Sequence, residues 1–169
     1  MPAISPRART GRGAATAAPR RIPDPPRRIL LALPSGAAGP EVIAKTIELA
    51  SPEHAKITVL GVARIFGTSL GLPHPGLQPT RLEWEQLRTD VEATAETLRR
   101  KGFEVRVALT RSRNAPKMIS KWVKAKNFHA VVVPGKELPR WRLLFEGDVA
   151  SEIGRLSGVP VHAVLAPPS

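Results

Sequence analysis

Residues 28–33 read Arg-Ile-Leu-Leu-Ala-Leu, a run that is wholly apolar after its first residue. A segment this short and this apolar is typical of a β-strand that is buried on both faces, as in a parallel sheet. Similar runs rich in valine, isoleucine and leucine follow at residues 56–62, 104–109, 130–133 and 159–165. The sequence therefore predicts five strands, each buried on both faces.

Helix signals separate these runs. Pro40 suits a first helical turn, and Thr80 can cap the start of a second helix. A third helix is expected to begin near Asn114, and a fourth to begin at Asp148 and end at Gly158. Strands that alternate with helices form parallel sheets through right-handed crossovers. The predicted fold class is therefore α/β, a five-stranded parallel sheet with helices on both faces.

The first residues of the chain differ in composition from the rest. Residues 1–28 contain six prolines, seven arginines and one acidic residue, Asp24. Their apolar residues are mostly alanine, whose burial cannot offset the entropy cost of ordering such a segment. We therefore expect a disordered basic tail, residues 1–27, before one α/β domain, residues 28–169. A solvated extension, a transit peptide and an anion-binding arm remain open as roles for the tail.

The composition of the 169-residue chain excludes several classes of protein. It has no cysteine, which removes disulfides and thiolate chemistry. No apolar run is long enough to span a bilayer, and we expect a cytoplasmic protein. The four histidines share no metal-ligand spacing, and no nucleophile elbow or Walker A loop occurs. We therefore expect no metal site, no catalytic residues and no enzyme. The formal net charge of +12 indicates anionic partners.

Three segments are expected to meet where the predicted sheet would hold a ligand. In an open parallel sheet, the ligand crevice lies beyond the carboxyl ends of the strands. The segments that reach it are Pro34-Ser35-Gly36, Val62-Ala63 and Pro134-Gly135. The loop that follows, and leads to the fourth helix, adds Lys136, Arg140, Arg142 and Gly147. Because N–H groups at a helix N-terminus favour an anion, this loop is a candidate phosphate cradle.

Residues 28–165 as a whole resemble the universal stress protein family. The resemblance rests on the order of the elements and on the motifs Ile29-Leu30-Leu31-Ala32-Leu33, Ala130-Val131-Val132-Val133-Pro134-Gly135 and Gly158-Val159-Pro160-Val161. It implies a sheet with strand order 3-2-1-4-5, a role in stress response or signalling, and frequent homodimers joined through the last strand. In this chain, that strand contains Pro160, Val161, His162, Ala163, Val164 and Leu165.

Many members of that family bind ATP through a loop that reads Gly, two residues, Gly, nine residues, Gly and then Ser or Thr. Gly135 fits the first position, but Leu138 stands in place of the second glycine. Gly147 comes one residue early, and Asp148 follows it instead of a hydroxyl residue. Pro34 replaces the acidic residue that the family has on the adenosine side. At ~4 Å and an effective dielectric of about 20, one like-charge pair costs on the order of 4 kcal/mol, so Asp148 would repel a triphosphate.

These departures favour a non-enzymatic module of the universal stress protein type that binds ATP weakly or not at all and needs no cofactor. The alternative is an ATP or AMP site, in which the Ala63 backbone meets the adenine. The phosphates would then be held by Gly135, Lys136, Arg140, Arg142 and Gly147. A third hypothesis is a protein that binds nucleic acid or an acidic partner through the basic tail and the third helix. Its candidate residues are Arg111, Arg113, Lys117, Lys121 and Lys124.

Overall fold

The computed structural model describes residues 27–34, 36–65, 78–135 and 148–165. The tail, residues 1–26, lies outside the described residues, so the predicted disorder there stays a prediction. In chain order the elements are β1 (Arg28–Leu33), α1 (Pro40–Ala50), the short 3₁₀ helix η1 (Ser51–Glu53), β2 (Lys56–Arg64), α2 (Arg81–Arg100), β3 (Val105–Ser112), α3 (Ala115–Lys126), β4 (Ala130–Gly135), α5 (Val149–Ser157) and β5 (Val161–Leu165).

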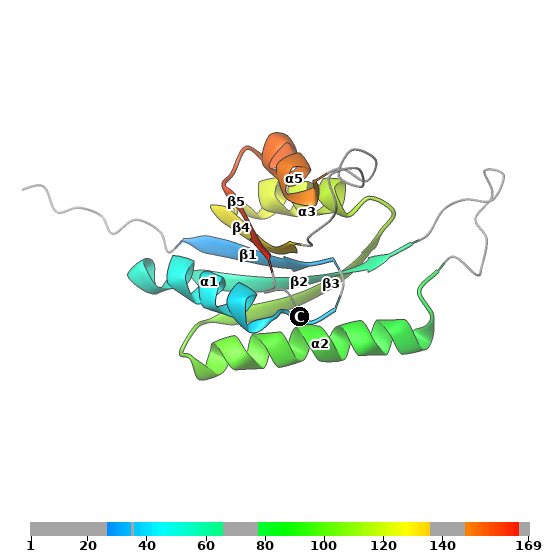
Figure 1. The fold of residues 1–169 in the computed structure, drawn as a ribbon, viewed down its shortest axis with the longest axis horizontal. Coiled ribbons are helices and arrows are strands. Elements are labelled where there is room, and N and C mark those ends of the chain that lie inside the picture. The colour runs from blue at the N-terminus through cyan, green and yellow to red at the C-terminus, as the bar shows by residue number, and fades with distance from the viewer. Residues whose placement is uncertain (1–26, 35, 66–77, 136–147, 166–169) are drawn as a thin grey trace, which may run out of the picture.

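The strands form one parallel sheet in the order β3-β2-β1-β4-β5. Helices α1 and α2 cover one face of this sheet, and α3 and α5 cover the other (Figure 1). The α/β class and the strand order 3-2-1-4-5 are therefore confirmed. After β3, the chain crosses to β4 on the other side of β1. Because such crossovers are right-handed, this change of direction places α3 on the opposite face of the sheet from α2.

Strand β1 lies in the middle of the sheet and supplies the core on both faces. Ile29, Leu31 and Leu33 belong to the hydrophobic cluster beneath α1 and α2. Leu30 and Ala32 belong to the second cluster, beneath α3 and α5. All five side chains are almost completely buried. The apolar sequence of β1 after Arg28 is thus explained, because neither face of residues 29–33 meets water.

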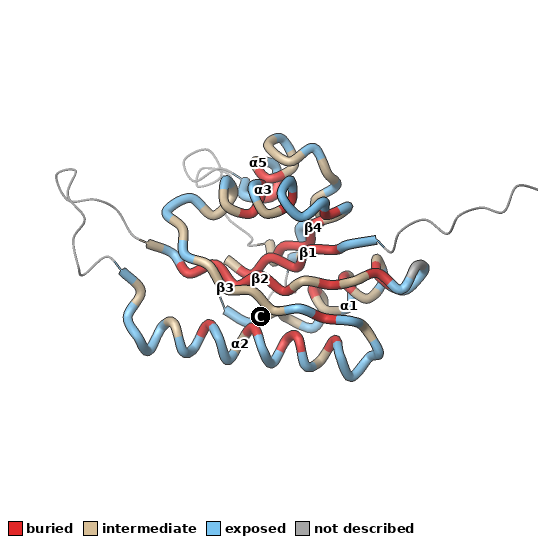
Figure 2. The backbone as a smooth tube through the Cα atoms, turned by 180° about the vertical axis from the view of Figure 1, so that it is seen from behind, coloured by how far each residue is buried: buried red, intermediate tan, exposed pale blue. Residues whose placement is uncertain are grey.

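The prediction that every strand is buried on both faces is wrong for β3 and β5. Val105 is the only buried residue of β3, and no residue of β5 is buried. Figure 2 shows this contrast between the buried centre of the sheet and its more exposed margins. Both strands lie at edges of the sheet, where each has a single neighbour and less cover from helices. Apolar content alone could not show which strands would be the outer ones.

The helix boundaries follow the capping residues that the sequence predicts. Thr80 and Glu83 form a reciprocal capping box at the start of α2. The side chain of Asn114 caps α3 by accepting a hydrogen bond from the Lys117 N–H. Gly158 ends α5 in the left-handed conformation, with a φ of 73°, which glycine adopts without steric cost. Local chemistry therefore fixes where these helices begin and end.

The capping box predicts a stability change at acidic pH. The Thr80 N–H and hydroxyl donate to the Glu83 carboxylate at 2.7 and 3.0 Å, and these bonds lower the pKa of Glu83. When folding lowers the pKa of a carboxyl group, its ionised form stabilises the folded state. This stabilisation is complete above the pKa that the group has in the unfolded state, and it is lost as the pH falls through the pKa that the group has in the folded state. Between about pH 5 and pH 3, unfolding titrations should show a smaller loss of stability in Glu83→Gln than in the wild type. Identical pH profiles would contradict the capping box.

Candidate functional site

The strand register places three of the predicted site residues at the carboxyl edge of the sheet. Strand β1 ends where Leu33 pairs with Gly61 of β2. β2 continues to Arg64, and β4 continues to Gly135, so both neighbours of β1 run past its end. Pro34 follows β1 directly, while Ala63 and Gly135 lie in the extensions of β2 and β4. This is the switch point at which open parallel sheets bind ligands.

Gly135, the last residue of β4, lies beside the end of β5. It pairs with Leu165 across β4 and β5. A Cβ atom at position 135 would lie 2.8 Å from Leu165 Cδ2 and 3.4 Å from the Val164 carbonyl oxygen. Because Leu165 is 51% exposed, the end of its side chain can turn away, and 3.4 Å from a carbonyl oxygen is an ordinary contact, so a Cβ atom at position 135 would fit after a small shift. Packing between β4 and β5 therefore does not require glycine at position 135, and the match of Gly135 to the first glycine of the phosphate loop stays a prediction.

The N-terminus of α5 already holds a negative charge. One carboxylate oxygen of Asp148 accepts a hydrogen bond from the Ala150 N–H at 3.1 Å. The other oxygen accepts one from the Ser151 hydroxyl at 2.7 Å. A phosphate at this helix end would meet a carboxylate that occupies the same donors and repels it. Among the described residues, two donors at the start of α5 are thus already bonded to a carboxylate of this chain.

Several predicted site residues cannot be placed. Those that lie outside the described residues are Ser35, Lys136, Leu138, Arg140, Arg142 and Gly147. Their part in a phosphate cradle stays a prediction. The part of the candidate site that the structure describes is therefore the carboxyl ends of β1, β2 and β4 together with the start of α5.

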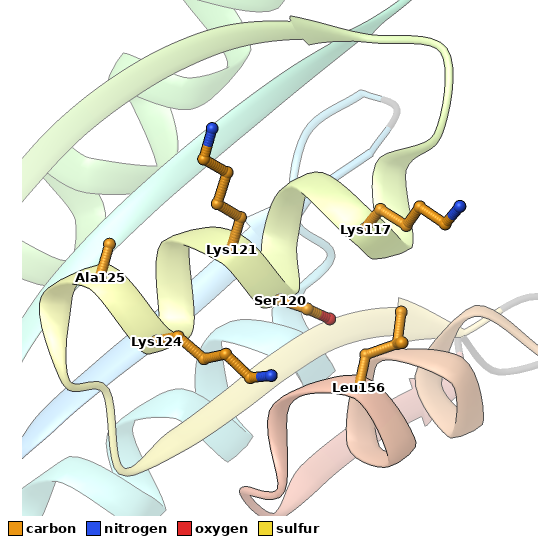
Figure 3. Close-up of a pocket in the computed structure, with 6 residues that line it drawn as sticks. All are labelled: Lys117, Ser120, Lys121, Lys124, Ala125 and Leu156. Carbon is orange, nitrogen blue, oxygen red and sulfur yellow. The ribbon is translucent and has the colours of Figure 1, made fainter.

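Three candidates for the polyanion site, Lys117, Lys121 and Lys124, lie together on α3. Lys117, Lys121 and Lys124 line a groove of about 610 Å³ between α3 and α5, together with Ser120, Ala125 and Leu156. Figure 3 shows Ser120 pointing from α3 toward α5, and Leu156 of α5 pointing back toward α3. Within the described part of the chain, no carboxylate lies in salt-bridge range of these three ammonium groups. The groove therefore carries uncompensated positive charge.

Arg111 and Arg113 do not join this groove. The guanidinium of Arg111 lies 5.5 Å from the centroid of the Trp84 ring, so it stacks against α2 on the opposite face of the sheet. Arg113 is exposed in the turn between β3 and α3. The structure thus brings together the lysines of the predicted polyanion site and separates Arg111 from them.

Sequence reasoning missed a second basic cluster, which lies at the amino ends of the strands. Arg28, Lys56, Arg106 and Lys126 line a cleft beside Trp122. The signal was present at the start of β3, where charged and apolar residues alternate from Glu104, just before the strand, to Val107. Such alternation indicates a strand with one exposed face, but the strand order is needed to show which other residues share that face.

Neither a metal-binding cluster nor a membrane-spanning helix occurs among the described residues. No three histidine, aspartate or glutamate side chains gather, among the residues with defined positions, in a way that could hold a metal ion. Along the same residues, none of the helices has both the length and the hydropathy that a bilayer crossing needs.

Comparison with known proteins gives the family. The sequence model of the universal stress protein family matches residues 26–164, and the chain belongs to this family. No protein of curated function matches the sequence. The predicted resemblance is therefore confirmed at the level of the family.

Solved structures agree with this assignment. A universal stress protein from Archaeoglobus fulgidus has a TM-score of 0.60 and 15% identity, over 81% of this chain and 92% of that one. One from the same organism in complex with dAMP has a TM-score of 0.58 and 16% identity, over 81% and 96%. An Arabidopsis thaliana member with AMP bound has a TM-score of 0.55 and 15% identity, over 84% and 93%. Identities this low support the fold alone.

Proposed function

We propose that this chain is a non-enzymatic stress-response or signalling module that binds ATP weakly or not at all. The observation that carries the proposal is the Asp148 carboxylate, which accepts two hydrogen bonds at the N-terminus of α5. Pro34 adds to it, because it offers no carboxylate and no N–H beyond the end of β1. The family's usual contacts with phosphate and adenosine are both impaired by these residues.

The proposed role also includes a homodimer joined through β5 and a cytoplasmic location. β5 pairs with β4 on one side only, among the strands of the described sheet, and the side chain of Leu165 is 51% exposed. An edge strand with unpaired backbone groups and exposed apolar side chains favours association with a second copy.

Calorimetric titration with ATP and AMP tests the proposal, and Asp148→Asn is the informative variant. Asparagine caps a helix as well as aspartate does, so the variant keeps α5 while removing the negative charge. The wild type should bind ATP no tighter than about millimolar, and Asp148→Asn should bind at least about tenfold tighter, since loss of repulsion exceeds about 1.4 kcal/mol. Asp90→Asn on α2 removes the same charge far from the site and should leave binding unchanged.

The nucleotide-binding alternative gives the opposite results. It draws support from the relatives whose structures contain dAMP, AMP and, in one case of 10% identity, cAMP. Micromolar affinity of the wild type for ATP or AMP, or nucleotide extracted from freshly purified protein, would establish this alternative and overturn the proposal. An unchanged affinity in Asp148→Asn would remove the physical reason given for weak binding.

A second candidate function is the binding of nucleic acid along α3. The observation that favours it is the groove lined by Lys117, Lys121 and Lys124, whose ammonium groups have no carboxylate in range among the described residues. Phosphate contacts of this kind release counterions, so the affinity falls steeply as salt is added. Binding that does not depend on salt, or no binding at low salt, would exclude this candidate.

A further inference from the structure

A cleft of about 210 Å³ opens at the amino ends of the strands, beneath the C-terminal half of α3. Its lining includes the first residues of β1 and β2, Arg28 and Lys56, and the last residue of α3, Lys126. Ala63, at the carboxyl edge, lies seven residues beyond Lys56 on the same strand, which is ~23 Å at ~3.3 Å per residue. The cleft is therefore separate from the candidate nucleotide site.

Four cations surround this cleft, and the described structure gives them one carboxylate. Glu104 lies 3.0 Å from Lys56 Nζ and 3.9 Å from an Arg106 guanidinium nitrogen. The guanidinium of Arg28 donates instead to the Lys126 carbonyl oxygen at 2.9 Å. The ammonium of Lys126 has no carboxylate in salt-bridge range among the residues with defined positions. The rim of the cleft is thus strongly positive, and its guanidinium and ammonium groups can donate to an anion.

The interior of the cleft is apolar and contains an aromatic ring. Phe128 is 7% exposed, and Trp122 packs half-buried against the same hydrophobic cluster. Thr58 and Ala108 contribute small side chains from β2 and β3. These small residues leave space beneath α3 at the side of the sheet where the edge strand is only partly covered. The result is an apolar hollow with a flat aromatic wall and a cationic rim.

The size of the cleft limits its occupant. Clefts that hold drug-sized ligands span about 300–1,000 Å³, and an apolar cavity of about 150 Å³ is enough to bind benzene. At about 210 Å³, this cleft fits one ring system rather than a nucleotide. A polymer such as nucleic acid would reach the rim but would leave the apolar interior empty. Charge and volume together therefore favour a small anion with an apolar body.

We propose that this cleft binds a small aromatic carboxylate, with its ring against Trp122 and Phe128 and its carboxylate at Arg106 and Lys126. The proposal is independent of the proposed function, because the two sites share no residue and lie at opposite ends of the strands. It assigns this chain a ligand of a chemical class different from adenine nucleotides.

The test uses 2-naphthoate as the probe and the full-length protein. The indole N–H signals of the three tryptophans, assigned with single Trp→Phe variants, report where the probe binds. Saturable shifts centred on the Trp122 signal are expected. The neutral amide of the same ring system, 2-naphthamide, should bind about tenfold weaker or worse, because it offers no anion to the cationic rim.

Variants of the rim and of the interior separate the two halves of the proposal. Arg106→Gln should weaken 2-naphthoate binding about tenfold, while Arg106→Lys, which keeps the charge, should retain most of it. Ala108→Leu fills the hollow and should abolish saturable binding, with an unchanged circular dichroism spectrum to show that the fold persists. Arg81→Gln on α2 removes a distant exposed arginine and serves as the matched control.

Three results would overturn the proposal. The first is a lack of saturable shifts with 2-naphthoate, and the second is shifts centred on Trp84 or Trp141 instead of Trp122. The third is equal affinity for 2-naphthoate and 2-naphthamide, which would show that the cationic rim takes no part. ATP binding measured on the same samples reports on the nucleotide site alone, so failure here is distinguishable from failure of the proposed function.

Discussion

Gly61→Val should destabilise the protein by about 3 kcal/mol, because the centre of the sheet has no space for a side chain there. A Cβ atom at position 61 would lie 2.7 Å from Val91 Cγ2 and 2.7 Å from Leu109 Cδ2. It would also lie 3.3 Å from Leu87 Cγ. Val91 and Leu87 are buried residues of α2. The variant must therefore push α2 away from β2 or force core side chains out of their rotamers.

Two opposing effects on this variant can be compared. Valine has a higher strand propensity than glycine, worth up to ~1 kcal/mol. Overpacking of a filled core costs roughly 1–3 kcal/mol and occasionally more, and valine adds three carbons where even one has no space. The steric cost therefore exceeds the gain in propensity.

Chemical denaturation measures this effect, and Gly154→Ala is the matched control. In α5, a Cβ at position 154 would have only an ordinary contact, 3.7 Å from Val161 Cγ2. Alanine in a helix interior is favoured over glycine by up to ~1 kcal/mol, so the control should be at least as stable as the wild type. A change smaller than ~0.5 kcal/mol in Gly61→Val would contradict the close packing of α2 over β2.

The second large effect is expected from the basic groove of α3. If duplex nucleic acid binds there, the combined variant Lys117→Gln, Lys121→Gln and Lys124→Gln should lose about a thousandfold in affinity at 50 mM salt. Each phosphate contact contributes about 0.9 to the slope of log affinity against log salt, so the slope should fall by about three. Glutamine has nearly the same helix propensity as lysine, so α3 should persist. Fluorescence anisotropy with labelled duplex DNA over a series of salt concentrations gives both quantities.

A control of equal net charge decides whether the groove or the total charge is responsible. Arg81→Gln, Arg88→Gln and Lys101→Gln remove three exposed cations from α2 and the turn that follows it, on the other face of the sheet. This combined variant should bind nearly as well as the wild type. Equal losses in both variants would show that the charge of the whole molecule drives binding, and the α3 groove would lose its role.

The sequence predicted the parts of the fold that local chemistry determines. The helix starts at Thr80, Asn114 and Asp148 are visible in the sequence because a cap depends on neighbours within three residues. The apolar run of β1 likewise follows from burial on both faces. The order of the strands was known only through the family resemblance. The burial of β3 and β5 was predicted wrongly because it was inferred from their apolar runs, although the strand order implied by the resemblance places both strands at the edges.

The candidate sites were predictable to different degrees. The lysines of α3 could be grouped from their helical spacing alone. The amino-edge cleft could not, because Arg28, Lys56, Arg106 and Lys126 come from four elements spread over about 100 residues. The pairing of β2 with β1 and β3 brings Arg28, Lys56 and Arg106 together, and the hydrogen bond from Arg28 to the Lys126 carbonyl oxygen holds the end of α3 beside them. Asp148 was recognised as a departure from a motif, but its carboxylate contacts with Ala150 and Ser151 required the structure.

The central place of β1 has a consequence for synthesis of the protein. The Arg28 N–H donates to His129 Nδ1 at 3.0 Å, although 101 residues separate them, and β4 follows at once. A ribosome adds roughly 5–20 residues per second, so about 5–20 s pass between the emergence of β1 and that of its second neighbour. Throughout this interval one edge of a wholly apolar strand has no native partner. The nascent chain is therefore most exposed to misassociation before β4 emerges, and a chaperone that shields hydrophobic segments would act in that period.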